Sequence, residues 1–120
     1  MQSYKELIVY KKSYLQALKT YELTKAFPSE ERYGMIGQFR RAAMSIPLNI
    51  AEGYGKSEQG REVVRFLSMA RGSSAEMEVL LEFAKDLGYI SRDEYKEGIG
   101  LQQEIGKMLT GLIQALTMKS

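Results

Sequence analysis

The run from Gln38 to Gly53, QFRRAAMSIPLNIAEG, constrains the fold of this chain more than any other segment. With the residues just before it, its apolar side chains recur at alternating spacings of three and four, as in a helix that buries one face in a bundle. This predicted core stripe comprises Ile36, Phe39, Ala43, Ile46 and Ile50. A second stripe lies almost opposite on the helical wheel and comprises Gln38, Arg41, Ser45, Asn49 and Glu52, with Met44 and Leu48 beside it.

Both ends of this second helix, and its one proline, can be placed from local signals. Ser29 is predicted to open it, because Glu30 and Glu31 then suit the first turn, and the glycines of GYG at 53–55 are predicted to end it. Pro47 removes one backbone hydrogen bond, at a cost of about 3 kcal/mol. We expect a single helix kinked at Pro47; the alternative is a split in which Ser45 caps a new helix.

The segment before it also has helical periodicity. A capping box of Ser3 and Glu6 is predicted to open the first helix, and Pro28 to stop it. Its recurring apolar residues are Ile8, Leu15 and Leu18, with a flanking row of Leu7, Tyr14 and Tyr21.

The third helix has two apolar sides, like the second. Ser57 is predicted to cap it, and it continues to Leu87 and closes on Gly88 as a left-handed residue. Its predicted seam comprises Val63, Leu67, Ala70, Ser74, Met77, Leu81 and Ala84. A second side of this helix, well away from the seam on the helical wheel, carries Met69, Leu80, Phe83 and Leu87, together with Arg65 and Glu76.

A capping box of Ser91 and Glu94 opens the fourth helix, which is predicted to run through Leu116. Its interior contains Gly98, Gly100, Gly106 and Gly111, each of which costs up to about 1 kcal/mol relative to alanine. We expect close packing against a neighbouring helix, or fraying near the C-terminus, to explain them; a hinge is the alternative. Because the loops are short, neighbouring helices should be antiparallel, giving an all-α up-down-up-down four-helix bundle.

Composition limits the class of protein. At 120 residues the chain fits one domain, residues 1–120. No apolar stretch approaches the roughly 20 residues of a membrane span, and the start is unlike a signal peptide, so we expect a cytoplasmic protein without membrane contact. The chain has no cysteine and no histidine. We therefore expect no enzyme, no cofactor and no metal site, since the commonest catalytic and ligand arrangements need these residues.

Charge is uneven along the chain. The net charge is only +2, but residues 32–72 carry seven Lys and Arg against three acids. The alternatives are a set of solvated helix faces and a basic surface that contacts nucleic acid, with Tyr54 as a stacking group. The candidate nucleic-acid contacts are Arg40, Arg41, Lys56, Arg61, Arg65 and Arg71.

The two-sided second and third helices predict a homo-oligomer, because monomers rarely expose a contiguous apolar band. Arginine, methionine and phenylalanine are enriched at interfaces. The predicted oligomer interface or ligand face comprises Arg41, Ser45, Asn49, Glu52, Arg65, Glu76 and Phe83. The alternative is that Leu80 or Phe83 widens the core of a monomer.

Three motifs also resemble a known family: FPSEERYG at 27–34, QFRRAAMSIPLNIAEGYG at 38–55 and FLSMARGSSAEME at 66–78. They resemble four-helix-bundle proteins encoded in 23S ribosomal RNA intervening sequences. The resemblance implies a bacterial bundle that assembles into a ring, typically a homopentamer, without established enzymatic activity. The structural or binding positions that it implies are Arg40, Arg41, Ser45, Asn49, Glu52, Arg71, Ser73 and Glu76.

This family is similar to accessory variability proteins of diversity-generating retroelements, basic pentameric bundles that engage a reverse transcriptase and nucleic acid. The resemblance therefore implies binding of RNA or DNA, although the near-neutral charge of this chain departs from those proteins. Two functions compete: an oligomeric scaffold that binds nucleic acid, and an adaptor for a protein partner or a self-assembling structural ring.

Overall fold

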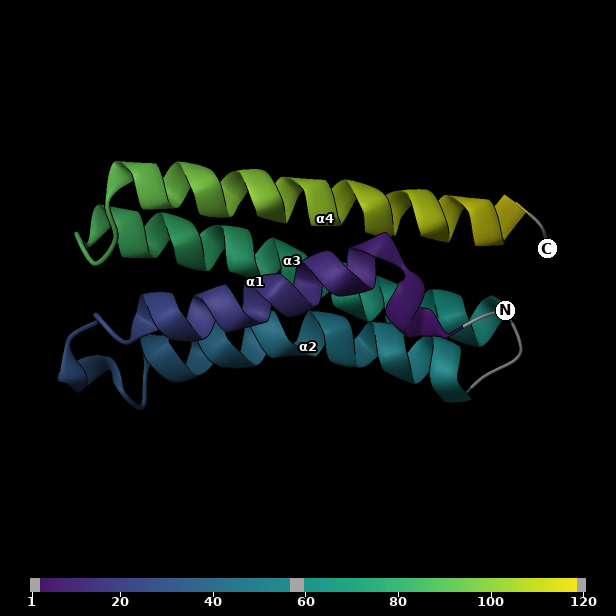
Figure 1. Cartoon of the computed structure of the whole chain (residues 1–120), viewed down its shortest axis with the longest axis horizontal. Coiled ribbons are helices and arrows are strands. Elements are labelled where there is room, and N and C mark those ends of the chain that lie inside the picture. Colours follow the sequence, from purple (N-terminus) through teal and green to yellow (C-terminus); the bar gives the residue numbers. More distant parts are fainter. Residues whose placement is uncertain (1–2, 57–59, 119–120) are drawn as a thin grey trace.

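The computed structural model describes residues 3–56 and 60–118, and within these ranges the chain is helical, without strands (Figure 1). The predicted all-α, four-helix fold is confirmed. Four α-helices and two short 3-10 turns follow one another as η1 (Tyr4–Glu6), α1 (Ile8–Thr24), η2 (Ser29–Glu31), α2 (Met35–Lys56), α3 (Gly60–Asp86) and α4 (Arg92–Met118).

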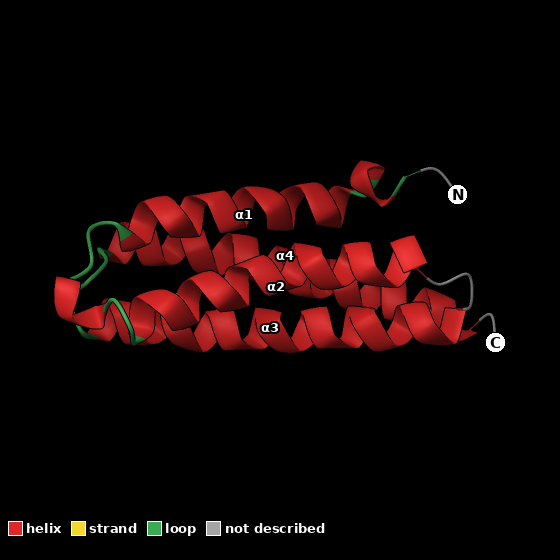
Figure 2. Cartoon of the chain, turned by 90° about the horizontal axis from the view of Figure 1, so that it is seen from below, coloured by secondary structure: helices red, strands yellow, loops and turns green. Residues whose placement is uncertain are grey.

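The four helices lie side by side along an elongated body of 46 × 23 × 20 Å. The chain doubles back between consecutive helices, as the sequence colours show (Figure 1), and the connections are short compared with the helices (Figure 2). Packing is most extensive between α2 and α3 and between α3 and α4. Among the helix pairs that touch, packing is least extensive between α1 and α4, so α1 is held chiefly by α2.

The core lies among α2, α3 and α4, at the predicted seams. Phe39, Ile46 and Ile50 of α2 are fully buried, and all seven seam residues of α3 are buried. On α4 the residues with the predicted spacing turn inward, and Ile105 and Leu109 are fully buried. The hydrophobic pattern therefore fixed the rotation of these three helices correctly.

Two predicted helix starts are wrong. Ser3 caps the short turn η1 by accepting a hydrogen bond from the backbone N–H of Lys5, and the chain is extended at Leu7 before α1 begins. Similarly, Ser29 opens only the turn η2, and α2 begins at Met35. In both places the local signal specifies one turn, which the following residues do not continue.

The predicted end of the second helix is also wrong, because α2 continues through the glycines to Lys56. Gly53 is needed for packing: a Cβ there would lie 3.0 Å from Cβ of Phe66, so the glycine lets α2 and α3 approach closely. Pro47 lies inside a continuous α2, so the split is excluded. The hydroxyl of Ser45 bonds to the carbonyl of Ala42 and caps no new helix.

The end of α3 and the start of α4 follow the prediction. Gly88 has a φ of +78°, and the N–H of Tyr89 bonds to the carbonyl of Ala84, as in a Schellman motif. Ser91 and Glu94 form the predicted capping box, with side-chain to backbone bonds of 2.8 and 3.0 Å. The predicted cap of the third helix at Ser57 lies outside the described residues.

The glycines of α4 fall into two groups. A Cβ at Gly98 would lie 2.9 Å from Cδ2 of Leu81, so close packing against α3 explains this glycine. A Cβ at Gly106 would lie 3.5 Å from the hydroxyl of Ser74, which is an ordinary contact distance. At Gly100 and Gly111 a Cβ would meet nothing within 4 Å, so packing within this chain does not explain them.

α1 is rotated away from the direction that its apolar residues indicate. Ile8, Leu15 and Leu18 face outward and are 62%, 47% and 54% exposed. The side that α1 buries against the bundle is largely polar and consists of Val9, Ser13, Gln16, Ala17, Thr20 and Thr24. Three of its hydroxyls bond to carbonyls of the same helix, which reduces the cost of burying them.

Candidate functional site

The outer sides of α2 and α3 form one surface, which we call the α2/α3 face. Two hydrogen bonds join the helices across it, one between the hydroxyls of Ser45 and Ser73 and one from the amide of Gln38 to the carboxylate of Glu76. We define the face as Arg41, Ser45, Leu48, Asn49 and Glu52 of α2 with Arg65, Met69, Ser73, Glu76 and Phe83 of α3. It contains every residue predicted for the oligomer interface.

Large apolar side chains are exposed on this face. Leu48 lies one turn beyond Ser45, and Met69 lies one turn before Ser73, so both flank the hydroxyl pair. They are 60% and 48% exposed, and Phe83, two turns beyond Glu76, is 55% exposed. Leu80, in contrast, is buried and belongs to the core, so its predicted outward position is wrong. The alternative of a wider core therefore holds for Leu80 and fails for Phe83.

The polar residues of the face differ in how firmly they are held. The amide of Asn49 donates a hydrogen bond of 2.8 Å to the carbonyl of Ser45. Arg65 bonds to Glu62 at 3.1 Å and lies over the ring of Phe66. Arg41 is exposed and has no hydrogen-bond or ion-pair partner in the described part of the chain.

The outward apolar residues of α1 form a second surface, the α1 ridge, which we define as Ile8, Leu15 and Leu18. The two surfaces are connected through Tyr21 of α1, whose hydroxyl contacts the sulfur of the exposed Met44 of α2 at 3.0 Å. Exposed apolar groups thus extend from α1 across α2 to α3.

The outer side of α4 has a different character. Among the described residues of α4, Met118 is the one large apolar side chain that is exposed. The rest of that side carries charged and amide residues and the two open glycines, for example Gln103, Lys107 and Gln114. Apart from Met118 at its end, the described part of α4 thus lacks the exposed large apolar side chains that α1, α2 and α3 carry.

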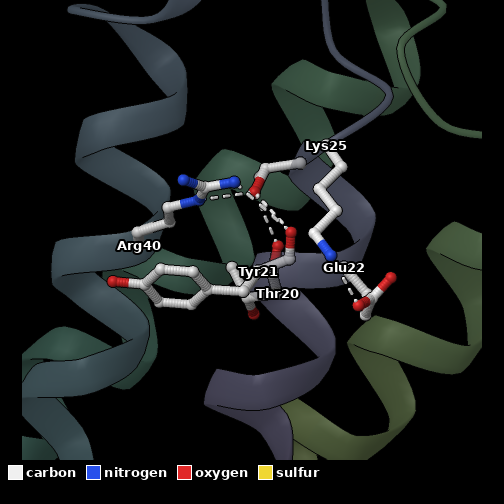
Figure 3. Close-up of polar contacts among 6 residues, drawn as sticks. Thr20, Tyr21, Glu22, Lys25 and Arg40 are labelled. Atoms are coloured by element: carbon white, nitrogen blue, oxygen red, sulfur yellow. Dashed lines mark hydrogen bonds and ion pairs between the residues drawn. The ribbon is translucent and has the colours of Figure 1, made fainter.

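Arg40 is predicted to contact nucleic acid, but it is already engaged within the chain. Its Nε donates to the hydroxyl of Thr24 at 2.9 Å, and its guanidinium lies 4.5 Å from the centre of the Tyr21 ring (Figure 3). Close by, Lys25 forms an ion pair with Glu22. Arg40 thus fastens α1 to α2, and its charge is less available to an external ligand.

The remaining basic candidates lie on more than one side of the bundle. Arg61 and Arg71 are exposed, and Arg71 faces the α3/α4 side, where it lines a polar groove with Lys107. The side chain of Lys56 lies outside the described part. Tyr54, the predicted stacking group, is half-buried against the core, and its burial raises the pKa of the phenol. Among the described candidates, Arg40 is held by α1 and Arg71 faces α4, whereas Arg61 and Arg65 lie one turn apart on α3.

The described residues offer neither a membrane span nor a cluster of metal ligands. No helix there combines the length and the apolarity that a membrane span requires. Nor do three or more acidic side chains gather there in an arrangement that could hold a metal ion. The cytoplasmic location stays a prediction.

A four-helix bundle with an extended apolar outer surface is the class of protein that these observations define. The family model for the 23S rRNA-intervening sequence protein matches residues 5–111, and the chain belongs to this family. The chain is also similar to a protein of unknown function from the S23 ribosomal protein family of Bacteroides thetaiotaomicron, whose crystal structure was determined at 1.70 Å resolution. The two are 28% identical with a TM-score of 0.81, over 89% of this chain and 96% of that one. A search of curated proteins found no match.

Proposed function

We propose that the protein is non-enzymatic and that its four helices form an up-down-up-down bundle. We further propose that copies of this bundle assemble into a ring. The observation that carries this proposal is the exposure of large apolar side chains on α1, α2 and α3, with a contact between Tyr21 of α1 and the exposed Met44 of α2. Contiguous apolar surface of this kind usually marks an interface. Burial of these groups between copies removes them from water, at about 25 cal/mol per Å² of apolar area.

The proposal specifies a heterologous contact, in which the α1 ridge of one copy meets the α2/α3 face of the next. The two surfaces differ in residues and lie on different helices, so a two-fold dimer through either one leaves the other in water. A heterologous contact covers both, and it closes into a ring when the rotation between copies allows. The hydrogen-bonded pairs of the face, such as Ser45 with Ser73, then provide polar register within an apolar contact.

Two double substitutions test the heterologous contact. We expect Leu15→Lys with Leu18→Lys, and separately Met69→Lys with Phe83→Lys, to give monomers in sedimentation velocity, because each buries charge in the contact. The matched control, Gln103→Lys with Gln114→Lys on α4, should assemble as the parent does. A mixture of the two monomeric variants should form a dimer of twice 13.6 kDa, since each retains the surface that the other lacks.

Failure of this mixture to dimerise, with both variants folded by circular dichroism, would contradict the heterologous contact and leave a two-fold interface as the explanation. Assembly of both double variants at the parental size would contradict the self-assembly proposal as a whole. If the chain is monomeric and a partner protein covers the apolar surface, it is instead an adaptor.

A second candidate function is an RNA-binding scaffold. It is supported by the name of the family and by Arg41, Arg61 and Arg71, which are exposed and lack ion-pair partners in the described ranges. An assembly repeats these arginines on each copy, so weak single contacts would add up. Their distribution over several sides of the bundle makes this candidate the weaker of the two.

The test for RNA is binding to a structured RNA at increasing salt, where each phosphate contact steepens the fall in affinity. The double substitution at Arg40 and Arg41 should weaken binding, but Arg40 also holds α1 to α2. Arg41→Gln with Arg71→Gln is therefore the cleaner variant, and Arg40→Gln is its control for fold. No binding even at low salt would remove this candidate.

A further inference from the structure

A groove lies between α1 and α4, which have the least contact of the helix pairs that touch. Its volume is about 460 Å³, which is within the range of small-molecule sites. The walls are mainly apolar, with Leu18 and Leu23 from α1, Met77 and Leu81 from α3, and Leu101 from α4. We call it the α1/α4 groove.

The sequence explains why this groove is open. Gly98 lets α4 approach Leu81 of α3 so closely that a methyl group there would clash at 2.9 Å. α4 therefore packs on α3, and its glycine presents no side chain toward α1. α1 in turn offers Gln16 and Thr20 on this side, together with the walls formed by Leu18 and Leu23. The space between the two helices is thus lined but not filled.

One buried polar atom at the groove has no partner. Gln16, which is 4% exposed, lines the groove and donates from Nε2 to Oε1 of Gln102, whose own Nε2 donates to the hydroxyl of Ser74. This chain of bonds ends at Oε1 of Gln16, a buried acceptor without a hydrogen-bond partner. Such an atom is costly to leave unsatisfied. Its neighbours cover it in this structure, so a donor group in the groove reaches it when the Gln16 side chain turns toward the groove.

The charged groups at the groove favour a cation. Three glutamates line it, Glu22, Glu94 and Glu97. Glu97 pairs with Lys19 at 3.2 Å and Glu22 pairs with Lys25 at 2.9 Å, so Glu94 is the one without an ion-pair partner in the described ranges. The lining therefore has an excess of negative charge above apolar walls. A ligand that complements it has a compact apolar body and a protonated nitrogen.

We propose that the α1/α4 groove is a binding site for a small amphipathic amine, whose N–H groups face Gln16 and the glutamates and whose apolar body contacts the leucines. The proposal is independent of self-assembly, because the groove residues, apart from Leu18, belong to neither the α1 ridge nor the α2/α3 face. A second copy that inserts a side chain into the groove is the competing occupant.

Phenylbutylamine is a suitable probe, with phenylbutanol as its neutral counterpart and phenylbutanoate as its anionic one. Titration of the folded protein, followed by amide chemical shifts in nuclear magnetic resonance, should give saturable changes around the groove with a Kd of about 1 mM for the amine. The alcohol should bind several-fold more weakly, and the anion more weakly still.

Two glutamates of α4 provide a matched pair of variants. Glu97 lines the groove and pairs with Lys19, whereas Glu104 pairs with Lys12 outside it, at 2.7 Å. We expect Glu97→Gln to weaken binding of the amine at least about threefold, a modest change typical of an exposed charge, and Glu104→Gln to leave its affinity unchanged.

Two further variants change the groove itself. Gln16→Met should reduce the preference for the amine over a purely apolar probe. Leu101→Trp, which fills the groove, should abolish binding.

Absence of saturable shifts with the amine would overturn the proposal, and so would equal affinity for amine, alcohol and anion. The same holds if Glu104→Gln weakens binding as much as Glu97→Gln. Because Leu18 belongs to both the groove and the α1 ridge, the variant Met69→Lys with Phe83→Lys separates the two proposals: it should lose self-assembly and keep its affinity for the amine. Binding of the amine by this monomeric variant but not by the assembled parent would show that a second copy occupies the groove, and would overturn the small-molecule proposal.

Discussion

α1 and α4 are both amphipathic helices of the same bundle, but they are oriented in opposite ways. α4 turns its apolar residues inward, so that Ile105 and Leu109 are fully buried, and leaves a polar outer side. α1 turns polar residues such as Ser13 and Gln16 inward and exposes Ile8, Leu15 and Leu18. The two helices thus bury opposite sides: α4 buries its apolar side, and α1 buries its polar side.

This difference indicates which helix orientations are explained by contacts within a single chain and which are not. The orientation of α4 is explained by the core that it covers. The orientation of α1 is not explained within one copy, because its larger apolar residues lie in water while amides and hydroxyls fill the interface with its neighbours. A contact with another copy would bury these apolar residues and so explain the orientation of α1. The first of the three predictions below compares the two helices directly, and the other two test how α4 is held.

The largest expected effect compares apolar truncations in the two helices. Ile105→Ala in α4 should lower the free energy of unfolding by about 2–5 kcal/mol, because it leaves a cavity in the core. Leu15→Ala in α1 should change it by less than about 0.5 kcal/mol in dilute protein, where each copy is alone. Urea unfolding at several protein concentrations measures both.

The same unfolding measurements can also show that the described orientation of α1 is wrong. If the orientation of α1 is correct, the effect of Leu15→Ala should grow with protein concentration, since only the assembled state buries Leu15. A loss as large as that of Ile105→Ala in dilute protein would mean that Leu15 is a core residue and that α1 is rotated from the position described.

A medium effect is expected for two glycines of α4. Gly98→Ala should destabilise the protein by about 1–3 kcal/mol, because the added methyl meets Leu81 at 2.9 Å. Gly100→Ala should stabilise it by up to about 1 kcal/mol, because alanine is the better helix former and the position is open. Thermal unfolding of the two variants, both on the same helix, compares them directly. A change in the same direction for both would contradict the close approach of α4 to α3.

The smallest effect concerns the connection that leads into α4. Tyr89 donates a hydrogen bond of 2.8 Å to Glu31 of η2, and this bond, with burial and the charges of Glu31 and Glu30, raises the pKa of the Tyr89 phenol above its ordinary value of 10.0. Stability from this bond is therefore present below pH 10 and is lost as the pH rises through the raised pKa. Tyr89→Phe should be less stable than the parent near neutrality, and the difference should shrink above pH 10.

Unfolding of both proteins across this pH range measures the effect, and the tyrosinate absorbance of the parent locates the pKa. A difference that stays constant above pH 10 would show that the phenol contributes by packing alone.

Sequence reasoning succeeded where large apolar residues decide the outcome. The stripes of α2 and α3 and the inward side of α4 were predicted because burial of Phe39, Leu67 or Ile105 dominates the energetics. It failed for the rotation of α1, where small polar residues fill a narrow interface with α2. A usable signal existed: Ser13, Gln16, Thr20 and Thr24 share one side and are uncharged. The apolar side, in contrast, is bordered by lysines.

For the candidate surface, the sequence predicted the α2/α3 face but missed the α1 ridge and the α1/α4 groove. The face has a clear signal, since apolar residues recur on both sides of α2 and α3. The ridge follows from the rotation of α1, which periodicity alone does not fix. The groove lies where α1 and α4 have little contact, beside the close approach of Gly98 to Leu81. No local pattern encodes such an arrangement of residues from different helices.

The most direct test of this account is the mass of the protein in solution, measured by sedimentation equilibrium or by light scattering at micromolar concentration. The exposed apolar surface of α1, α2 and α3 predicts an assembly whose mass is a whole multiple of 13.6 kDa and which dissociates in the ridge variant. A stable monomer of 13.6 kDa that shows no concentration dependence would contradict the account.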